Sequence, residues 1–404
     1  MHRSSQFAAT LITISSGIGL FTATTIATAQ ANSTFNFKFT DSPGQYAVGF
    51  KVVEQYDHSR PFSLQEGGKP LDEGRPLQTM IWYPAVKSSA PKMKLGEFTE
   101  LSNFETSFSK SVEHGAPQQF VHTFMLGTED QTAASTRDAL DQTGRFPVVI
   151  YAPSINSPAF ENIELYEYLA SHGYVVIATP SIGVSSRHMT VDLAGVNAEV
   201  QDISFLIDFA KKLPDANLSE LAIIGYSWGG TAALLAARKD HQIKALVALD
   251  GSFRYSSEVD VHSGRTKIPL LFFSRGETPL VNAALTDAKE KSQAIVLEDW
   301  TAGDLLQVRL LAVSHIQFSS LYQRSERFQR EGMQFVPKGY SLEDGAESYN
   351  WMARYILEFL NAYLKNNREA RSFLMNTPAE NGVPSRLMTM EFRLAVDSKT
   401  PPAN

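Results

Sequence analysis

Apolar and amphipathic segments alternate along the second half of the chain. Short runs of β-branched, aromatic and other apolar residues predict strands, and apolar positions at helical spacing between them predict helices. The predicted strands are 146–152, 174–179, 221–224, 243–249, 269–273 and 305–313, and the predicted helices are 160–171, 194–213, 231–238 and a terminal helix at 349–364. Strands that alternate with helices pair in parallel, with helices on both faces of the sheet. The pattern therefore predicts an α/β fold with a mostly parallel sheet.

The region before residue 146 has a different pattern. Residues 46–53 and 77–83 are rich in β-branched and aromatic residues, and the glycine-containing turns between them predict antiparallel edge strands. Residues 86–145 lack a strand pattern, and we interpret them as a helical, cap-like insertion. The chain is therefore expected to form one domain at 32–404, with N-terminal strands at 32–85, the insertion at 86–145 and the core at 146–404.

Residues 1–31 have the pattern of a secretory signal peptide. His2 and Arg3 precede a long uncharged stretch that ends in small residues, which predicts Sec-type cleavage after Ala29 or Ala31. The alternative is an uncleaved membrane anchor, but the many Thr and Ser residues of the stretch disfavour a stable span. We therefore expect a secreted or periplasmic bacterial protein with no membrane span after signal removal.

Charge and cysteine content exclude several function classes. The net charge is −7, and loss of the leader with Arg3 lowers it to −8, which opposes binding to nucleic acid. The chain has no cysteine, so its fold does not depend on disulfides, it has no thiolate nucleophile, and no N-terminal cysteine could carry a lipid anchor. These features suit an exported enzyme.

The residues Gly225-Tyr226-Ser227-Trp228-Gly229 form a Gly-x-Ser-x-Gly motif between a predicted strand and a predicted helix. This context is typical of a nucleophile elbow, in which a sharp turn exposes the serine hydroxyl. The glycines allow the strand and the helix to approach closely. The first helical amide, that of Trp228, is then expected beside the space where negative charge develops during acyl transfer. The alternative is a structural glycine turn.

The base that activates Ser227 should follow the end of a later strand. Three histidines come after Ser227: His241 lies at the far end of the elbow helix, His262 precedes a strand, and His315 follows the apolar run at 305–313. We therefore expect His315 to be the general base.

Two acids could orient His315. Asp250 ends the predicted strand at 243–249, and Glu277 lies at the equivalent place after the next strand. Either position can hold the acid that fixes the tautomer of the imidazole. The residues around Glu277 have the pattern of an exposed segment, so the sequence favours Asp250.

Four segments together resemble the platelet-activating-factor acetylhydrolases and the related dienelactone-hydrolase-like esterases of the α/β-hydrolase fold. They are Gly225 to Gly230, Ala248-Leu249-Asp250, Pro269 to Phe273 and Val313 to Phe318, and the likeness covers about residues 146–320. The resemblance implies an α/β-hydrolase fold and a triad of Ser227, Asp250 and His315. The nucleophile is serine, in contrast to the cysteine of bacterial dienelactone hydrolases.

The resemblance also implies a second oxyanion donor after the first strand of the sheet, where this chain departs from the family. Ala152-Pro153-Ser154 stands in place of the usual His-Gly. Pro153 has no N–H, so the amide of Ser154, or that of Ile155, is expected to act with that of Trp228.

The sequence as a whole predicts a serine carboxylic-ester hydrolase that acts through an acyl-enzyme without cofactor or metal. We expect a small-molecule or lipid-like ester with an apolar acyl or aryl group. Phe98, Leu101, Phe104 and Phe108 recur at helical spacing at 96–112, and this helix either packs on the core or overhangs the active site as a substrate wall. The alternatives are an amidase or peptidase with the same triad, and a catalytically silent binding protein.

Overall fold

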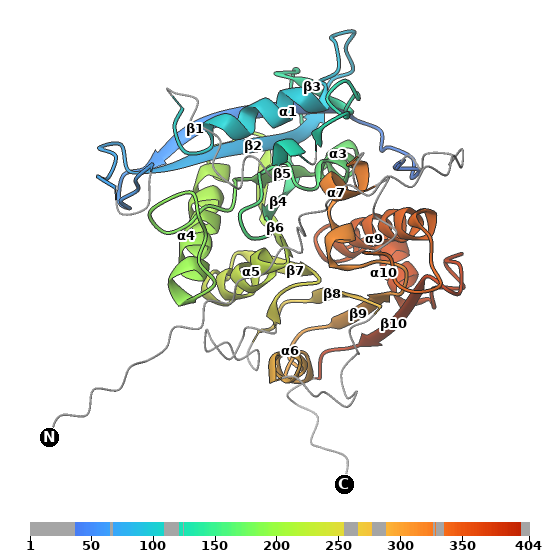
Figure 1. Cartoon of the computed structure of the whole chain (residues 1–404). Coiled ribbons are helices and arrows are strands. Elements are labelled where there is room, and N and C mark those ends of the chain that lie inside the picture. The colour runs from blue at the N-terminus through green and yellow to red at the C-terminus, as the bar shows by residue number, and fades with distance from the viewer. Residues whose placement is uncertain are drawn as a thin grey trace, which may run out of the picture. The chain divides into compact units, whose positions relative to one another are not determined.

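The strands of the computed structural model form one mixed sheet in the order β10-β9-β8-β7-β6-β4-β5-β2-β1-β3 (Figure 1). The structure describes residues 37–64, 68–108, 121–123, 125–253, 266–276, 288–325, 328 and 335–396, which belong to one compact unit at Phe35–Asn404. The expected signal peptide at 1–31 lies outside the described residues.

Six central strands run parallel, as the alternating pattern predicts. They are β4 (Phe146–Ala152), β5 (Val175–Ala178), β6 (Ala216–Tyr226), β7 (Ile243–Leu249), β8 (Leu270–Arg275) and β9 (Leu305–Leu310). In space β4 lies between β5 and β6, so the strand order reverses there. Ligands of open α/β sheets bind beyond the carboxyl ends of the strands at such a reversal. The loop after β4 and the turn after β6 are therefore where a site is expected.

The flanking strands differ partly from the prediction. β1 (Ala47–Asp57) and β2 (Arg75–Ala85) pair in antiparallel fashion as expected. However, β1 is not an edge strand, because β3 (Ser135–Arg137), from the insertion expected to lack strands, pairs with it in parallel. At the other edge, β10 (Met388–Arg393) pairs with β9 in antiparallel fashion.

Helices cover both faces of the sheet because the strand side chains alternate (Figure 1). Val149 and Tyr151 of β4 belong to one apolar cluster, and Val148 and Ile150 belong to the other. Helices α1 (Leu95–Leu101), α3 (Ile163–Ser171), α7 (Ser320–Arg324), α9 (Leu342–Tyr363) and α10 (Arg368–Met375) pack on the first cluster, and helices α4 (Leu193–Ala210), α5 (Trp228–Lys239) and α6 (Ala288–Glu298) pack on the second.

The prediction of a terminal helix at 349–364 is wrong in one respect. Helix α9 is present, but α10 and β10 follow it. The segment of β10 is short and half-exposed, and it is a strand because it pairs with the open edge of β9. Such pairing is a tertiary effect that periodicity in one segment does not contain.

The insertion helix packs on the core, which is the first of the two interpretations of its aromatic residues. The ring of Phe98 is fully buried and lies 4.8 Å from the ring of Phe50 and 6.3 Å from that of Trp82, centroid to centroid. The helix ends at Leu101, and a short 3₁₀ turn continues it to Phe104. Phe108 packs on Tyr56 of β1 at 4.8 Å. Because its ring is enclosed by the core, Phe98 cannot be a substrate wall.

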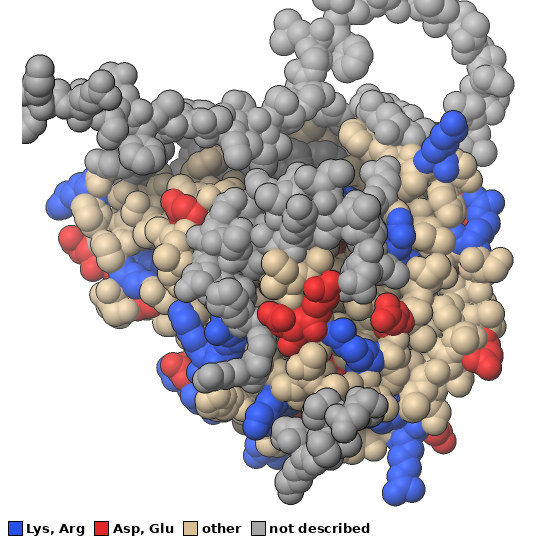
Figure 2. All heavy atoms as spheres, turned by 90° about the horizontal axis from the view of Figure 1, so that it is seen from below, with Lys and Arg blue, Asp and Glu red and all other residues tan. Residues whose placement is uncertain are grey.

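The described surface carries charges of both signs. Where described atoms are visible in Figure 2, Lys and Arg side chains lie among Asp and Glu rather than in one continuous stripe. No described helix combines the length and the apolar character needed to span a bilayer.

Candidate active site

Ser227 occupies the strained turn expected of a nucleophile elbow. Its backbone has φ +52° and ψ −118°, in the half of conformational space that non-glycine residues avoid. A side-chain carbon on Gly229 would lie 2.1 Å from the Ala152 carbonyl oxygen, and one on Gly225 would lie 2.4 Å from the Gly229 carbonyl oxygen. Glycine is therefore required at both positions. The turn is fixed by the Ser227 N–H, which donates to the Leu249 carbonyl at 3.1 Å.

The structure brings Ser227, His315 and Asp250 into one hydrogen-bonded chain. Ser227 Oγ lies 2.9 Å from His315 Nε2, and His315 Nδ1 lies 2.5 Å from Asp250 Oδ2. Asp250 is fully buried, whereas the His315 side chain is 33% exposed. This order of nucleophile, base and buried acid is the arrangement that activates a serine for acyl transfer.

Contacts outside the three residues hold the histidine and the acid in place. The hydroxyl of Tyr226 donates to the His315 carbonyl at 2.6 Å, and the two rings lie 5.3 Å apart. The Asp250 N–H donates to the Phe273 carbonyl at 2.9 Å, and its backbone has φ +41°. Tyr226, directly before Ser227, thus also fixes the backbone of His315.

Besides the imidazole of His315, Asp250 has a cationic partner that sequence analysis did not identify. Arg275 Nη1, at the end of β8, lies 3.0 Å from the same Oδ2 atom that accepts from His315. A guanidinium beside the carboxylate favours its ionised form. The alternative acid, Glu277, and the histidine His262 lie outside the described residues, and His241 is exposed at the far end of α5.

The expectation that the Ser154 amide is an oxyanion donor is wrong. The Ser154 N–H donates to Glu161 Oε2 at 2.8 Å, and its hydroxyl donates to Glu161 Oε1. An amide that is engaged by a buried carboxylate cannot also turn toward an ester oxygen. The Ile155 amide, which sequence analysis left open, is the next N–H along this loop, and Trp228 is the first residue of α5.

The loop at 154–157, which follows β4, is held from several directions. Asn156 has φ +60°, its side-chain oxygen accepts from the Met189 N–H at 2.8 Å, and its carbonyl accepts from Arg187 at 3.1 Å. The Ser181 N–H donates to the Ser157 carbonyl at 3.0 Å. Arg187 in turn pairs with the buried Glu105 at 2.7 Å. The backbone after Ile155 is therefore held by backbone and side-chain groups that are remote in sequence.

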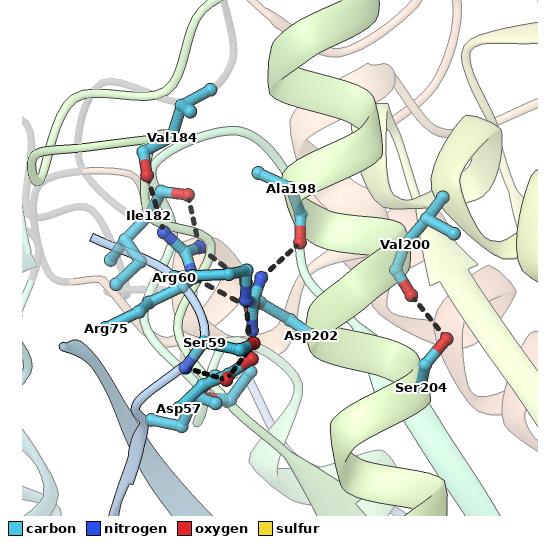
Figure 3. Close-up of polar contacts among 12 residues, drawn as sticks. Asp57, Ser59, Arg60, Arg75, Ile182, Val184, Ala198, Val200, Asp202 and Ser204 are labelled. Atoms are coloured by element: carbon cyan, nitrogen blue, oxygen red, sulfur yellow. Dashed lines mark hydrogen bonds and ion pairs between the residues drawn. The ribbon is translucent and has the colours of Figure 1, made fainter. Parts of the chain in front are cut away.

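A buried ionic cluster holds the neighbouring loop between β5 and α4 (Figure 3). Arg75, at the start of β2, is fully buried and donates to the carbonyls of Ile182, Gly183 and Val184. It also forms a two-point ion pair with Asp202 of α4, at 2.8 and 2.6 Å. Arg60 also forms an ion pair with Asp202, with 2.8 Å between Arg60 Nη2 and Asp202 Oδ1. The cluster ties β2, the loop and α4 together.

Replacement of Asp202 by asparagine is expected to lower the free energy of unfolding by about 3–5 kcal/mol, because it leaves the buried Arg75 without its carboxylate. Urea denaturation of the two proteins measures the difference. Asp208→Asn is the matched control, since it breaks an exposed pair with Lys211 on the same helix and should change stability little. Equal, small changes in both variants would contradict a structural role for the cluster.

Among the described residues, no group of three or more His, Asp or Glu is placed to hold a metal ion.

Sequence analysis missed Glu161, Asn156, Arg187 and Arg275. Of these, only Asn156 has a local sequence signal, because asparagine shortly after an apolar strand is compatible with a turn of positive φ. That signal is weak. The others are recognisable only by their contacts.

Comparisons with known proteins show which family model and which fold the chain is similar to. A family model described as chlorophyllase matches residues 137–258, which is less than half of the chain. The chain is also similar to a solved structure of a ferulic acid esterase from Streptomyces cinnamoneus, with a TM-score of 0.62 and 17% identity over 81% of this chain and 93% of that one. No curated protein matches the chain.

The matched segment at 137–258 contains β4, the elbow and Asp250. The structural likeness shows the fold, and the predicted α/β-hydrolase architecture is confirmed. Together the two matches confirm the expected resemblance to ester hydrolases of that fold.

Proposed function

We propose that the chain is an exported serine hydrolase that cleaves carboxylic esters through an acyl-enzyme on Ser227. The observation that carries the proposal is the continuous chain from Ser227 Oγ through His315 to the buried Asp250, set at a strained elbow beyond the carboxyl end of β6. Ser227 acts as nucleophile, His315 as general base and acid, and Asp250 as the group that orients the imidazole and stabilises its charged form.

The reaction proceeds in two steps. His315 Nε2 takes the proton of Ser227 as its oxygen attacks the ester carbonyl, and the same nitrogen then gives that proton to the departing alcohol. A water molecule, deprotonated by His315, attacks the acyl-enzyme, and the proton returns to Ser227 as the carboxylic acid leaves. In both steps the negative oxygen is held by the amides of Trp228 and Ile155.

The substrate is proposed to be a small-molecule or lipid-like ester with an apolar acyl or aryl group. The half-buried Ile155, on the loop beside Ser227, packs against the apolar cluster on that side of the sheet, in which Trp228 is itself buried. One similar solved structure is a ferulic acid esterase and a matching family model is described as chlorophyllase, which supports a carboxylic ester as the substrate. Phe98 contributes no wall, since the core encloses it.

Hydrolysis of a p-nitrophenyl ester series by the protein from Asn32 onward tests this function. We expect turnover to rise from acetate toward longer or aromatic acyl groups, and to exceed that of matched p-nitroanilides, because an alcohol leaves more readily than an amine. The absence of ester turnover in protein whose Ser227 reacts with a fluorophosphonate would contradict ester hydrolysis. A maximum at acetate would contradict the apolar acyl group.

Export is tested separately. Protein recovered from the periplasm or medium of an expressing bacterium is expected to begin at Gln30 or Asn32, as N-terminal sequencing would show. Recovery of the uncut chain in the membrane fraction would contradict cleavage.

A further inference from the structure

The carboxylate of Glu161 lies at the centre of a buried polar region beside the proposed oxyanion loop. It is fully buried and accepts from both polar hydrogens of Ser154, from the N–H at 2.8 Å and from the hydroxyl. The Ser154 hydroxyl oxygen also lies 2.7 Å from that of Ser157, and the Ser157 N–H donates to the Ser154 carbonyl at 3.0 Å. The Glu161 side chain thereby holds the Ser154 end of the turn that carries Ile155.

The backbone of Glu161 binds the segment that follows the catalytic histidine. Its carbonyl accepts from the Ser319 hydroxyl at 2.8 Å and from the Leu321 N–H at 3.2 Å. The next residue, Asn162, accepts from the Ser320 N–H at 2.8 Å. Ser319 directly follows the 3₁₀ turn His315–Phe318. Glu161 and Asn162 therefore join the loop after β4 to the segment that holds the base.

We propose that Glu161 is a positioning residue for the oxyanion loop, and that its grip on Ser154 sets the direction of the Ile155 amide. The inference rests on the proposed function. The proposed donor is the N–H of Ile155, which comes directly after the Ser154 N–H that Glu161 binds. A shift of Ser154 therefore moves the Ile155 N–H with it. A donor displaced by about 1 Å loses much of its effect on the transition state.

The groups that face Glu161 are hydroxyls, amides and a second acid. The phenols of Tyr151, Tyr166, Tyr226, Tyr322 and Tyr349 and the carboxyl of Glu199 interact with it electrostatically.

Burial raises the pKa of the Glu161 carboxyl to about 7, and the hydrogen bonds from Ser154 oppose this rise. A protonated carboxyl keeps both contacts, because its carbonyl oxygen accepts from the Ser154 N–H while its O–H donates to the hydroxyl. The reach of the side chain, and not its charge, is what the loop requires.

Two substitutions of Glu161 separate reach from charge. Glu161→Asp keeps the charge but withdraws the oxygens by one methylene, and Glu161→Gln keeps the reach without the charge. Rates are expressed per Ser227 titrated with a fluorophosphonate, so that a smaller folded fraction does not count. We expect Glu161→Asp to lower kcat by about 10²-fold with little change in KM, and Glu161→Gln to lose at least about tenfold less than Glu161→Asp.

A matched control exists in α3, the helix that follows Glu161. Glu167 is also buried and accepts from the Ser135 hydroxyl and, at 2.7 Å, from its N–H, but it holds the edge strand β3. Glu167→Asp should therefore reduce thermal stability without changing kcat per titrated site. If Glu167→Asp lowered kcat as much as Glu161→Asp, the effect of Glu161 would be a general loss of packing.

The opposite ranking, with Glu161→Gln more damaging than Glu161→Asp, would overturn the proposal in favour of a role for the charge. Equal activity of both variants and the wild type would also overturn it. Failure of the proposed function has a different signature, since the wild type would then cleave no ester. In that case the variants are still ranked by the rate at which a fluorophosphonate phosphonylates Ser227, because the phosphonyl oxygen occupies the same oxyanion hole.

Discussion

Replacement of Ser227 by alanine is expected to lower ester turnover by about 10⁶-fold, because it removes the nucleophile on which both steps depend. The elbow should survive, since alanine needs no more space than serine in a turn already fixed by the Ser227 N–H and by Gly225 and Gly229. Turnover of the best p-nitrophenyl ester, measured with a purified variant whose thermal unfolding matches the wild type, tests the expectation.

Residual activity within about 10²-fold of the wild type would place the nucleophile elsewhere. Labelling with a fluorophosphonate provides the control, because the wild type should form one adduct at Ser227 and the variant none. An adduct in the variant would identify the other nucleophile by mass spectrometry. Trace activity near 10⁻⁶ of the wild type is the range left by binding and the oxyanion hole alone.

Asp250→Asn is expected to lower kcat by about 10⁴-fold with the fold intact. Asp250 Oδ2 accepts from His315 Nδ1 at 2.5 Å, and an amide NH₂ at that place would favour the wrong tautomer of the ring. The amide would also lose the ion pair with Arg275 at 3.0 Å, so urea denaturation should accompany the kinetics. The catalytic effect of Asp250→Asn is the loss of kcat that remains when only the folded fraction of the variant is counted.

Glu277→Gln is the comparison that decides between the two acids of the sequence. A change of less than about tenfold is expected, since the described contacts of His315 Nδ1 lead to Asp250. A 10⁴-fold loss in Glu277→Gln with normal activity in Asp250→Asn would mean that Glu277 is the acid and that Asp250 serves only as the partner of Arg275.

Local patterns sufficed for much of the scaffold. The strands at 146–152 and 243–249 have the bounds expected from their apolar runs. Gly173, which follows α3, has a φ of +85°, a conformation that glycine adopts readily at the end of a helix. Strand β9 ends at Leu310, three residues earlier than its apolar run, so His315 follows a turn rather than the strand itself. The bounds of the two strands and the φ of Gly173 are properties of short segments, whose backbone conformation depends on neighbours in sequence.

The partners of Ser227 could also be predicted from the sequence, for a topological reason. In a parallel sheet the carboxyl ends of all strands meet at one edge, so candidates after later strands are few. His315 was selected by its place after 305–313 and Asp250 by its place after 243–249, and the structure joins both to Ser227. The oxyanion donor was misassigned because the partner that occupies the Ser154 amide, Glu161, has no signature in spacing.

By itself, then, the sequence determined the α/β layering, the elbow at Ser227 and the short set of residues that could complete it, because periodicity and glycine placement act within a few residues. Tertiary structure alone decided that Phe98 belongs to the core, that β3 and β10 extend the sheet, and that Ser154 is held by Glu161 while Arg275 shares Asp250. Each of these depends on which buried surfaces and unpaired groups meet after the chain has folded, and the free energy of such contacts belongs to pairs of segments rather than to either one.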